Sequence, residues 1–326
     1  MSNGAAAELH AVILAGGLTF EREVSQRSGR RVADALKHAG LEAPILDTDI
    51  TLVDQLAASR PDAVFIALHG GAGEDGALRS VLDLIDVPYV GSTPGACRMA
   101  WDKPNAKAAV RSAGLPTPDW VALPQTTFRE LGAQVVLDRI VARLGLPLMV
   151  KPAQGGSALG AHRVDAVEDL PAAMVGCFAY CDTALIERFL PGVELAISVV
   201  AGPGGLEVLP AVEIVPFSGV FDYASRYNAG MTTYHRPARL EPSVAAEAAR
   251  LAERAHRVLG LRDLSRTDAI VTPAGEVHFL EVNVAPGMTE TSLLPMAVEA
   301  AELDLGELCV ALLHRAAGRS RIDSSV

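Results

Sequence analysis

The sequence predicts an α/β protein at its N-terminal end, followed by regions of mixed α+β structure. Short apolar runs alternate with helix-length segments over the first hundred residues. Glycine-rich loops directly follow these runs, as at the ends of buried strands. Later in the chain, strand-like runs follow one another through tight turns, which is typical of antiparallel pairing.

The first region has the pattern of a parallel sheet. Residues 10–14 (HAVIL) and 63–68 (AVFIAL) have the length and composition of buried strands. Helices are expected at about residues 25–39 and 76–84, and a third short strand at 87–90. Because strands that alternate with helices form βαβ units, we expect these strands to pair in parallel.

The later regions carry more strand-like runs. A strand at 146–150 leads into a loop that contains lysine and glycine, and the turn at 273–275 (PAG) suits a hairpin. A helix is expected at about 242–258. Further strands are expected at residues 184–190, 194–200, 206–214, 269–271 and 277–282. The length of 326 residues favours two or three lobes over a single core.

The composition is that of a globular protein and excludes some functions. The formal net charge is −11, and so acidic a chain is a poor general nucleic-acid binder. The four cysteines are scattered, so we expect reduced thiols and no zinc site. The first nine residues do not have the pattern of a signal peptide, and no run of about 18 apolar residues occurs. We therefore expect a cytoplasmic protein with no nucleic-acid partner and no membrane span.

Three oxygen-bearing side chains form the strongest chemical cluster. Glu281 and Asn283 lie two apart on one predicted strand and share a face, and Asp268 lies on or next to the preceding strand. Hard oxygen ligands of this kind suit Mg²⁺. The alternative is a solvated polar face on an edge hairpin, but the turn-rich run at 284–289 is typical of a loop that shapes a site.

Two glycine-rich loops are weaker signals. Residues 155–160 (GGSALG) follow Lys151, so backbone amides and an ammonium group could contact phosphates, although the loop is not a GxxxxGK[ST] motif. A plain hairpin turn explains this loop equally well. Gly16 and Gly17 lack the GxGxxG pattern and give no support to dinucleotide binding.

Polar residues follow both N-terminal strands. Ligands of open parallel sheets bind at the carboxyl ends of the strands. Each of these residues can also be a helix cap or a surface charge, and Ser25 in particular is placed to cap a helix. The residues are Glu21, Glu23 and Ser25 after the first strand, and His69, Glu74 and Asp75 after the second.

Short motifs occur in a fixed order along most of the chain. They are GGLTFEREVS (16–25), HG (69–70) with GEDG (73–76), PYVGS (88–92), DK (102–103) with Lys107, KP (151–152) with GS (156–157), DY (222–223) with Tyr227, RTD (266–268), EVN (281–283), and PGMT (286–289) with SL (292–293). Single motifs among these are common to ATP-grasp enzymes. The opening motif combined with HG…GEDG and NxxPGMTxxSL is far more specific. From about residue 12 to residue 297 the chain resembles the D-alanine–D-alanine ligases.

This resemblance implies a three-lobed ATP-grasp fold that binds ATP between its second and third lobes. The lobes would span residues 1–100, 101–190 and 191–326, and the last would carry the metal site and a lid at 217–236. Two Mg²⁺ ions, with Mn²⁺ as an alternative, would be held by Asp268, Glu281 and Asn283. The residues implied to contact ATP are Lys103, Lys151, Glu187, Phe189, Leu190 and Glu194.

The resemblance also implies a reaction and its residues. ATP would convert the carboxylate of one D-alanine into an acyl phosphate, which the amine of a second D-alanine attacks; the dipeptide serves peptidoglycan precursors. Arg266 would steady the transferring phosphate. Glu21 would bind the first ammonium, supported by Ser157 and Tyr227 as catalytic residues. His69, Ser292 and Leu293 are the other implied substrate-binding residues.

Some positions depart from the family pattern. Ala158 stands where a second serine is frequent, Arg226 where a lysine often precedes the loop tyrosine, and Val284 where threonine is common. A related ligase for another amino or hydroxy acid pair is therefore the first alternative, although Tyr227 favours a dipeptide product. A non-catalytic nucleotide-binding regulator is a second alternative, and retention of Arg266 and the proposed metal ligands argues against it. We also expect a homodimer.

Overall fold

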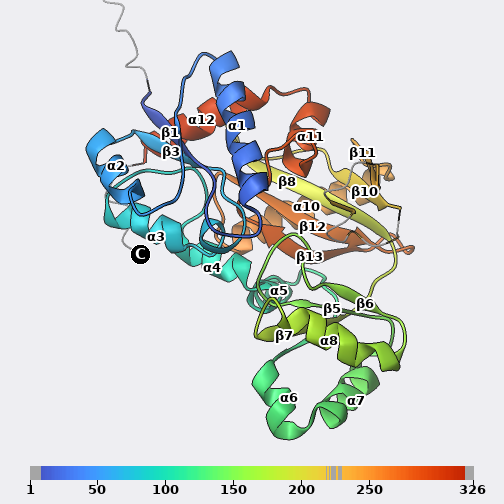
Figure 1. Ribbon diagram of the computed structural model, residues 1–326. Helices are drawn as coiled ribbons and strands as arrows, with labels where there is room; N and C mark the ends of the chain where they lie inside the picture. The colour runs from blue at the N-terminus through green and yellow to red at the C-terminus, as the bar shows by residue number, and fades with distance from the viewer. Residues whose placement is uncertain (1–8, 218, 220, 222–224, 227–229, 320–326) are drawn as a thin grey trace, which may run out of the picture.

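The computed structural model describes residues 9–217, 219, 221, 225–226 and 230–319 (Figure 1). It has the mixed helix-and-sheet architecture that the sequence predicts, with a parallel sheet first and antiparallel sheets after it. In Figure 1 the parallel sheet and the last sheet lie together in the upper part of the molecule, and the central sheet with its helices projects below them. No helix in the described ranges is long and apolar enough to cross a membrane.

The parallel sheet has the strand order β2-β1-β3, and β1 and β3 are buried along their whole length. Ser25, which the sequence placed as a helix cap, instead joins the ends of these strands: its hydroxyl accepts from Gly16 N at 2.8 Å and donates to Ala67 O at 2.9 Å. The helix begins earlier, at Arg22. The elements are β1 (Ala11–Leu14), α1 (Arg22–His38), β2 (Ile45–Leu46), α2 (Leu52–Ser59), β3 (Ala63–Ile66), a 3₁₀ turn (Gly71–Gly73) and α3 (Ala77–Leu84).

The third strand predicted at 87–90 is wrong in extent. Only an isolated parallel bridge joins Tyr89 to Val64. The two hydrogen bonds of this bridge run from Val64 N to Pro88 O and from Val90 N to Val64 O, both at 2.8 Å. Because Pro88 has no N–H with which to extend the ladder, the pairing ends there.

The central sheet is antiparallel, in the order β4-β7-β5-β6. Its own hydrophobic core is formed between the sheet and its helices, and Leu148, Val150, Leu170 and Ile186 are fully buried in it. The elements are β4 (Trp120–Pro124), α6 (Gln125–Leu131), α7 (Ala133–Leu144), β5 (Leu148–Pro152), β6 (His162–Val164), a 3₁₀ turn (Val167–Asp169), α8 (Leu170–Phe178) and β7 (Thr183–Arg188).

The last sheet has the order β11-β10-β8-β12-β13, and β9 pairs with the far end of β8. The single strand predicted at 206–214 is wrong: it is two strands, β9 and β10, separated at Leu209–Ala211. Pro210, which cannot donate to a ladder, lies in this break. The elements are β8 (Val193–Gly202), β9 (Gly205–Val208), β10 (Val212–Pro216), β11 (Thr232–His235), α10 (Pro242–Val258), β12 (Leu264–Val271) and β13 (Val277–Asn283).

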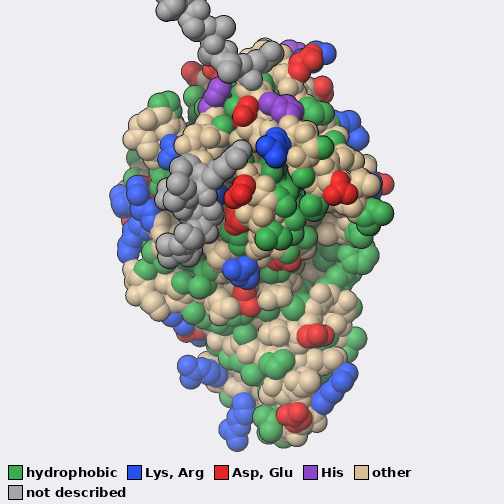
Figure 2. All heavy atoms as spheres, turned by 90° about the vertical axis from the view of Figure 1, so that its left-hand side faces the viewer, with side chains coloured by type: hydrophobic (Ala, Val, Ile, Leu, Met, Phe, Trp, Pro, Cys, Tyr) green, Lys and Arg blue, Asp and Glu red, His purple; other side chains and the backbone are tan. Residues whose placement is uncertain are grey.

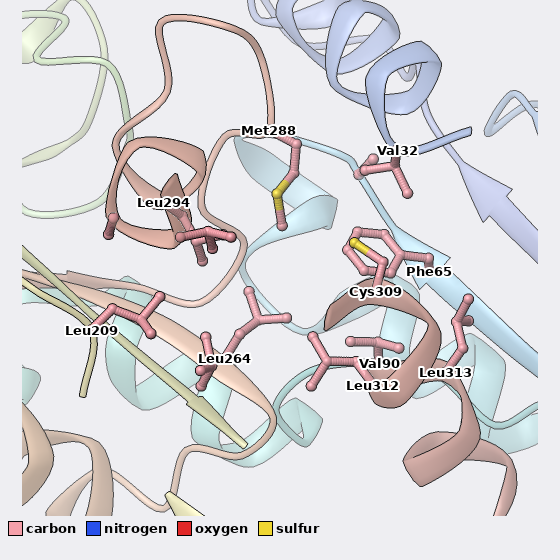
Figure 3. Packing of buried hydrophobic residues seen from close by; sticks show 14 of the residues in the cluster. Val32, Phe65, Val90, Leu209, Leu264, Met288, Leu294, Cys309, Leu312 and Leu313 are labelled. Atoms are coloured by element: carbon pink, nitrogen blue, oxygen red, sulfur yellow. The ribbon is translucent and has the colours of Figure 1, made fainter. Parts of the chain in front are cut away.

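The remaining helices tie the regions together. α4 (Pro94–Trp101) and α5 (Lys103–Ser112) pack against β13 of the last sheet. Of the C-terminal helices, α11 (Leu293–Ala300) packs on β8 and β10 of the last sheet, and α12 (Leu305–Ala317) returns to the parallel sheet, where it packs on α1 and β3. Figure 3 shows Val32, Phe65, Cys309 and Leu313 converging from these elements. Because these buried side chains come from both ends of the chain, the first and last regions share one core. Burial of each such side chain contributes about 1.5–3 kcal/mol to stability. The lobe boundaries at residues 100 and 190 stay a prediction.

On the face shown in Figure 2, lysine and arginine side chains are spread among acidic and apolar ones. The four cysteines are free thiols, as expected: Cys97, Cys177 and Cys309 are buried and Cys181 is half-buried.

Candidate active site

A deep pocket lies between the central sheet and the last sheet. Its walls come from β5 and β7 on one side and from β8, β12 and β13 on the other. The residues that the sequence assigned to ATP all line it, together with two of the proposed metal ligands. They are Lys103, Lys151, Glu187, Phe189, Leu190, Glu194, Asp268 and Glu281.

Two ammonium groups face a carboxylate inside this pocket. The Nζ atoms of Lys103 and Lys151 each lie 3.9 Å from Glu281 Oε2. Lys103 Nζ also donates to Gly155 O at 2.7 Å, which fixes the glycine-rich loop over the pocket. Burial lowers the pKa of Lys103, whereas for Lys151 burial is outweighed by Glu187 and Glu281, and its pKa is raised. The two cations are placed to meet an anion such as a phosphate chain.

Glu187 lies at the back of the pocket and is held by two lysines. Its Oε1 is 2.7 Å from Lys151 Nζ, and its Oε2 is 2.7 Å from Nζ of the fully buried Lys107. Burial acts to raise the pKa of Glu187, but the two ammonium groups outweigh it and lower the pKa. Glu194, on β8, has no ion pair of this kind among the described residues, and burial raises its pKa to about 7.

The proposed metal ligands share one face of the β12–β13 pair. Asp268 pairs across the ladder with Glu281, and Arg266 pairs with Asn283. A bulge follows directly after Asp268, and bulges of this kind redirect side chains beside functional sites. The two-residue spacing on each strand therefore brings Asp268, Glu281 and Asn283 to one patch, as the sequence predicts.

Arg266 and Asn283 complete this patch. Arg266 makes a two-point contact with Asp268, Nε to Oδ1 at 2.7 Å and Nη2 to Oδ2 at 2.9 Å. Asn283 Oδ1 accepts from Ala285 N at 2.7 Å, which orients the amide. Within the described ranges no three His, Cys, Asp or Glu residues gather as a metal cluster. Two carboxylates and one amide oxygen are nevertheless a donor set that fits Mg²⁺, which completes its shell with water and phosphate oxygens.

The charge state of Glu281 agrees with that use. Burial acts to raise its pKa, but Lys103, Lys151, Arg226 and Arg266 outweigh burial and hold the pKa at about 2. The carboxylate is therefore ionised at neutral pH.

A second, more polar pocket adjoins the first, and Phe221 and Arg226 line both. The hydroxyl of Ser157 donates to Glu21 across the pocket, so the predicted contact between these two residues is present. Gly70, at φ +67°, passes directly against the Glu21 carboxylate and leaves no room for a Cβ. The assigned residues that line this pocket are Glu21, His69, Ser157, Arg266, Ser292 and Leu293. Tyr227 lies outside the described residues.

The start of α11 closes this pocket on one side. Ser292 is the residue before the first helical position, and its Oγ accepts from Thr289 N at 3.0 Å. Leu293 begins the helix. The unpaired N–H groups at a helix N-terminus attract a carboxylate or another anion.

Glu74 and Arg226 also line the second pocket, and neither was among the assigned site residues. Glu74 Oε1 accepts from Gly70 N at 2.8 Å, and burial together with the nearby Glu21 raises its pKa to about 7. Its place after the second strand was the available signal, but a helix cap explained that position equally well. Arg226 borders both pockets, and the sequence showed it only as a departure from the family pattern.

His69 connects three segments of the second pocket. Its Nδ1 is 3.2 Å from Ala285 O and therefore carries the proton, so Nε2 accepts from the Ser28 hydroxyl at 2.8 Å. Ser28 Oγ in turn accepts from Met288 N at 3.1 Å. The neutral imidazole thus joins α1 to the loop after β13.

We expect His69 to make stability sensitive to acid. Burial lowers its pKa from 6.5 to about 4, so the unfolded chain binds a proton below pH 6.5 that the folded protein rejects. This contribution is fully present above pH 6.5 and is lost as the pH falls to 4, amounting to about 2–3 kcal/mol. Between pH 7 and pH 4.5, the free energy of unfolding measured in urea should fall by about 2–3 kcal/mol less for His69→Gln than for the unsubstituted protein. His314→Gln, at an exposed position on α12, is the control. An equal loss in His69→Gln would contradict this role.

Comparisons with known proteins agree with this geometry. The family model described as the D-ala D-ala ligase C-terminus matches residues 109–314, and the model of the D-ala D-ala ligase N-terminus matches residues 48–92. The D-alanine–D-alanine ligase of Bordetella avium is 38% identical over 309 residues, which cover 95% of each chain. The solved D-alanine–D-alanine ligase of Bacillus anthracis with ATP is 25% identical and has a TM-score of 0.79, covering 96% of this chain and 98% of that one. The VanG D-Ala:D-Ser ligase of Enterococcus faecalis is 26% identical, also with a TM-score of 0.79, covering 93% and 98%.

Proposed function

The chain belongs to the D-alanine–D-alanine ligase family, and from this premise we propose how its two adjoining pockets join two D-alanines. It is an ATP-dependent ligase whose family makes the dipeptide for peptidoglycan precursors. One observation carries the proposal. Arg226 lines both the pocket with the lysines and the pocket with Glu21. A smaller cavity lined by Arg266, Glu281 and Asn283 shares residues with both pockets, and a phosphate and a carboxylate would come together there.

The reaction has two steps. A carboxylate oxygen of the first D-alanine attacks the terminal phosphorus of ATP, ADP leaves, and an acyl phosphate forms. The amine of the second D-alanine then attacks the carbonyl carbon of the acyl phosphate. The tetrahedral species that results loses a proton from its nitrogen and expels phosphate, and the peptide bond is formed. Lys103 and Lys151 hold the phosphate chain, and Arg266 stabilises the charge on the transferring phosphoryl group and on the tetrahedral species.

We assign Asp268, Glu281 and Asn283 to two Mg²⁺ ions, with Mn²⁺ as an alternative. Bound there, the ions would neutralise phosphate oxygens. The chain's own part is to keep Glu281 ionised through its lysine and arginine neighbours, and to orient Asp268 by the two-point contact of Arg266.

The same reasoning assigns the ATP and amino-acid positions. Glu194 takes the ribose hydroxyls, and adenine lies near Glu187 and the backbone at Phe189 and Leu190. Glu21 receives the ammonium of the first D-alanine, since its carboxylate lines the second pocket and is held there by the Ser157 hydroxyl. Tyr227 belongs to this network by its place after the DY motif at 222–223. The second carboxylate lies at Ser292 and Leu293, where α11 begins. His69 holds the loop that carries this helix.

Further parts of the proposal concern the whole molecule. The lobes are residues 1–100, 101–190 and 191–326. The lid, predicted as a loop at 217–236, lies partly outside the described residues and ends in the strand β11; it would keep water from the acyl phosphate. The protein acts in the cytoplasm as a homodimer. Closure can be measured by limited proteolysis within 217–236, with and without ATP and D-alanine, and the dimer by sedimentation.

The substrate pair is tested by ATP-dependent phosphate release with single amino or hydroxy acids. We expect turnover with D-alanine and discrimination against L-alanine of roughly a hundredfold or more, because the L-enantiomer leaves a buried charge unpaired. D-Serine or D-lactate as the preferred second substrate, in assays with D-alanine as partner, would assign the chain to a related ligase. Comparable turnover of L-alanine would contradict the proposal.

Glu21→Gln tests the first amino-acid position. We expect the KM for D-alanine to rise about tenfold or more, since the amide cannot balance an ammonium charge. The Kd for ATP, measured separately by calorimetry, should stay unchanged. Glu23→Gln, two residues on and exposed in the first turn of α1, is the control. A normal D-alanine KM in Glu21→Gln would remove Glu21 from its assigned role.

A further inference from the structure

Lys107 is a fully buried cation that lines neither pocket of the site. It lies on α5, one helical turn after Lys103, and its side chain is 0% exposed. Burial lowers its pKa to about 8. A buried ammonium group is costly unless it is paired, so this position calls for an explanation.

The contacts of Lys107 point to one partner. Its Nζ lies 2.7 Å from Glu187 Oε2 and donates to Thr117 Oγ1 at 2.6 Å. Thr117 Oγ1 in turn donates to Phe279 O at 2.8 Å, so the ammonium group is fixed against β13. The ring of Trp120, whose centroid is 5.1 Å from Nζ, covers it. Lys107 therefore cannot leave Glu187 without losing three contacts.

Glu187 is shared between a fixed lysine and a movable one. Lys151 contacts the other carboxylate oxygen, also at 2.7 Å, but its side chain is 12% exposed and faces the nucleotide pocket. Lys151 and Glu187 are diagonal neighbours on the paired strands β5 and β7, since Met149 lies opposite Glu187. The two lysines thus compete for one carboxylate.

The net charge of the lysine and glutamate cluster determines how strongly Glu187 holds Lys151. Lys103, Lys107 and Lys151 face Glu187 and Glu281, so the cluster carries one net positive charge. Without the charge of Lys107, the cluster is neutral and Lys151 is the sole cation in contact with Glu187 among the described residues. Lys151 would then be held back from a phosphate chain.

We propose that Lys107 is a positioning residue that neutralises Glu187 from behind and thereby frees Lys151 for the phosphates of ATP. This inference rests on the proposed function, because it takes Lys151 to be a phosphate ligand. Lys107 touches neither nucleotide nor reacting atoms. Its effect reaches ATP only through Glu187 and Lys151.

The test compares ATP with adenosine, which lacks the phosphates that Lys151 would contact. In calorimetry on the full chain, Lys107→Met should raise the Kd for ATP about tenfold or more and that for adenosine by less than about threefold. Adding Glu187→Gln removes the carboxylate that retains Lys151. The double variant should therefore return the ratio of the two Kd values towards that of the unsubstituted protein.

Arg111→Met is the matched control. Arg111 is a cation on the same helix that stacks on Trp120 at 4.1 Å, but it pairs with Asp119 and not with Glu187. Arg111→Met should leave the ratio of the Kd values for ATP and adenosine unchanged. If Lys107 serves only the stability of the fold, Lys107→Met lowers the melting temperature while the ratio stays the same, and the proposal is wrong.

The outcomes separate this inference from the proposed function. Tight ATP binding by both the unsubstituted protein and Lys107→Met contradicts the role of Lys107 alone. An unsubstituted protein that binds ATP no more tightly than adenosine contradicts both.

Discussion

Glu281→Gln should reduce D-alanine-dependent phosphate release at least about a thousandfold while leaving the fold intact. The amide has nearly the shape of the carboxylate but carries no charge to hold a divalent cation. Glu281 is ionised because Lys103, Lys151, Arg226 and Arg266 outweigh its burial, so the substitution removes the charge that the site is built to keep.

Steady-state phosphate release measures this effect, with circular dichroism to check the fold. Glu276→Gln is the control, because Glu276 lies at the exposed turn of the same β12–β13 hairpin. It should keep full activity. Retention of more than about a tenth of the activity by Glu281→Gln would exclude a metal-binding role of the usual size.

Arg266→Met should lower kcat by about a hundredfold to a thousandfold, the range seen when a group that stabilises developing charge is removed. It should also destabilise the protein by about 3–5 kcal/mol. Arg266 is 7% exposed, and its guanidinium makes a two-point contact with Asp268. Methionine leaves that carboxylate buried without its partner.

Arg266→Lys separates the two effects. Lysine restores the positive charge but not the planar fork, so stability should recover more than activity. Urea unfolding gives the first quantity and steady-state kinetics the second. If Arg266→Lys is fully active, the geometry of the guanidinium is not needed for the reaction.

The sequence predicted the arrangement of the site where that arrangement depends on patterns between neighbouring residues. Alternation placed Glu281 and Asn283 on one face, and the turn at 273–275 paired their strand with that of Asp268. Two errors arose at prolines: Pro88 limits the third parallel strand to a bridge, and Pro210 lies where the predicted strand 206–214 is broken. A proline inside a predicted strand argues against a continuous ladder, so both errors had a visible sign.

Other features depend on tertiary contacts that no local pattern shows. Helix α12 packs on β3 of the N-terminal sheet, although more than two hundred residues separate the two elements. Ser25 had the pattern of a cap but joins two strand ends. Lys107 belongs to the motif that begins at Asp102, but its burial against Glu187 and Thr117 arises only in the folded chain.

The most direct test of the account follows oxygen from substrate to phosphate. The protein is supplied with ATP and D-alanine that carries ¹⁸O in its carboxylate, and the released phosphate is analysed by mass spectrometry. Because the carboxylate oxygen attacks phosphorus and the acyl phosphate is then opened at carbon, we expect one ¹⁸O in each phosphate and one D-alanyl-D-alanine per phosphate. Phosphate without ¹⁸O, or phosphate released without dipeptide, would contradict ligation through an acyl phosphate in this site.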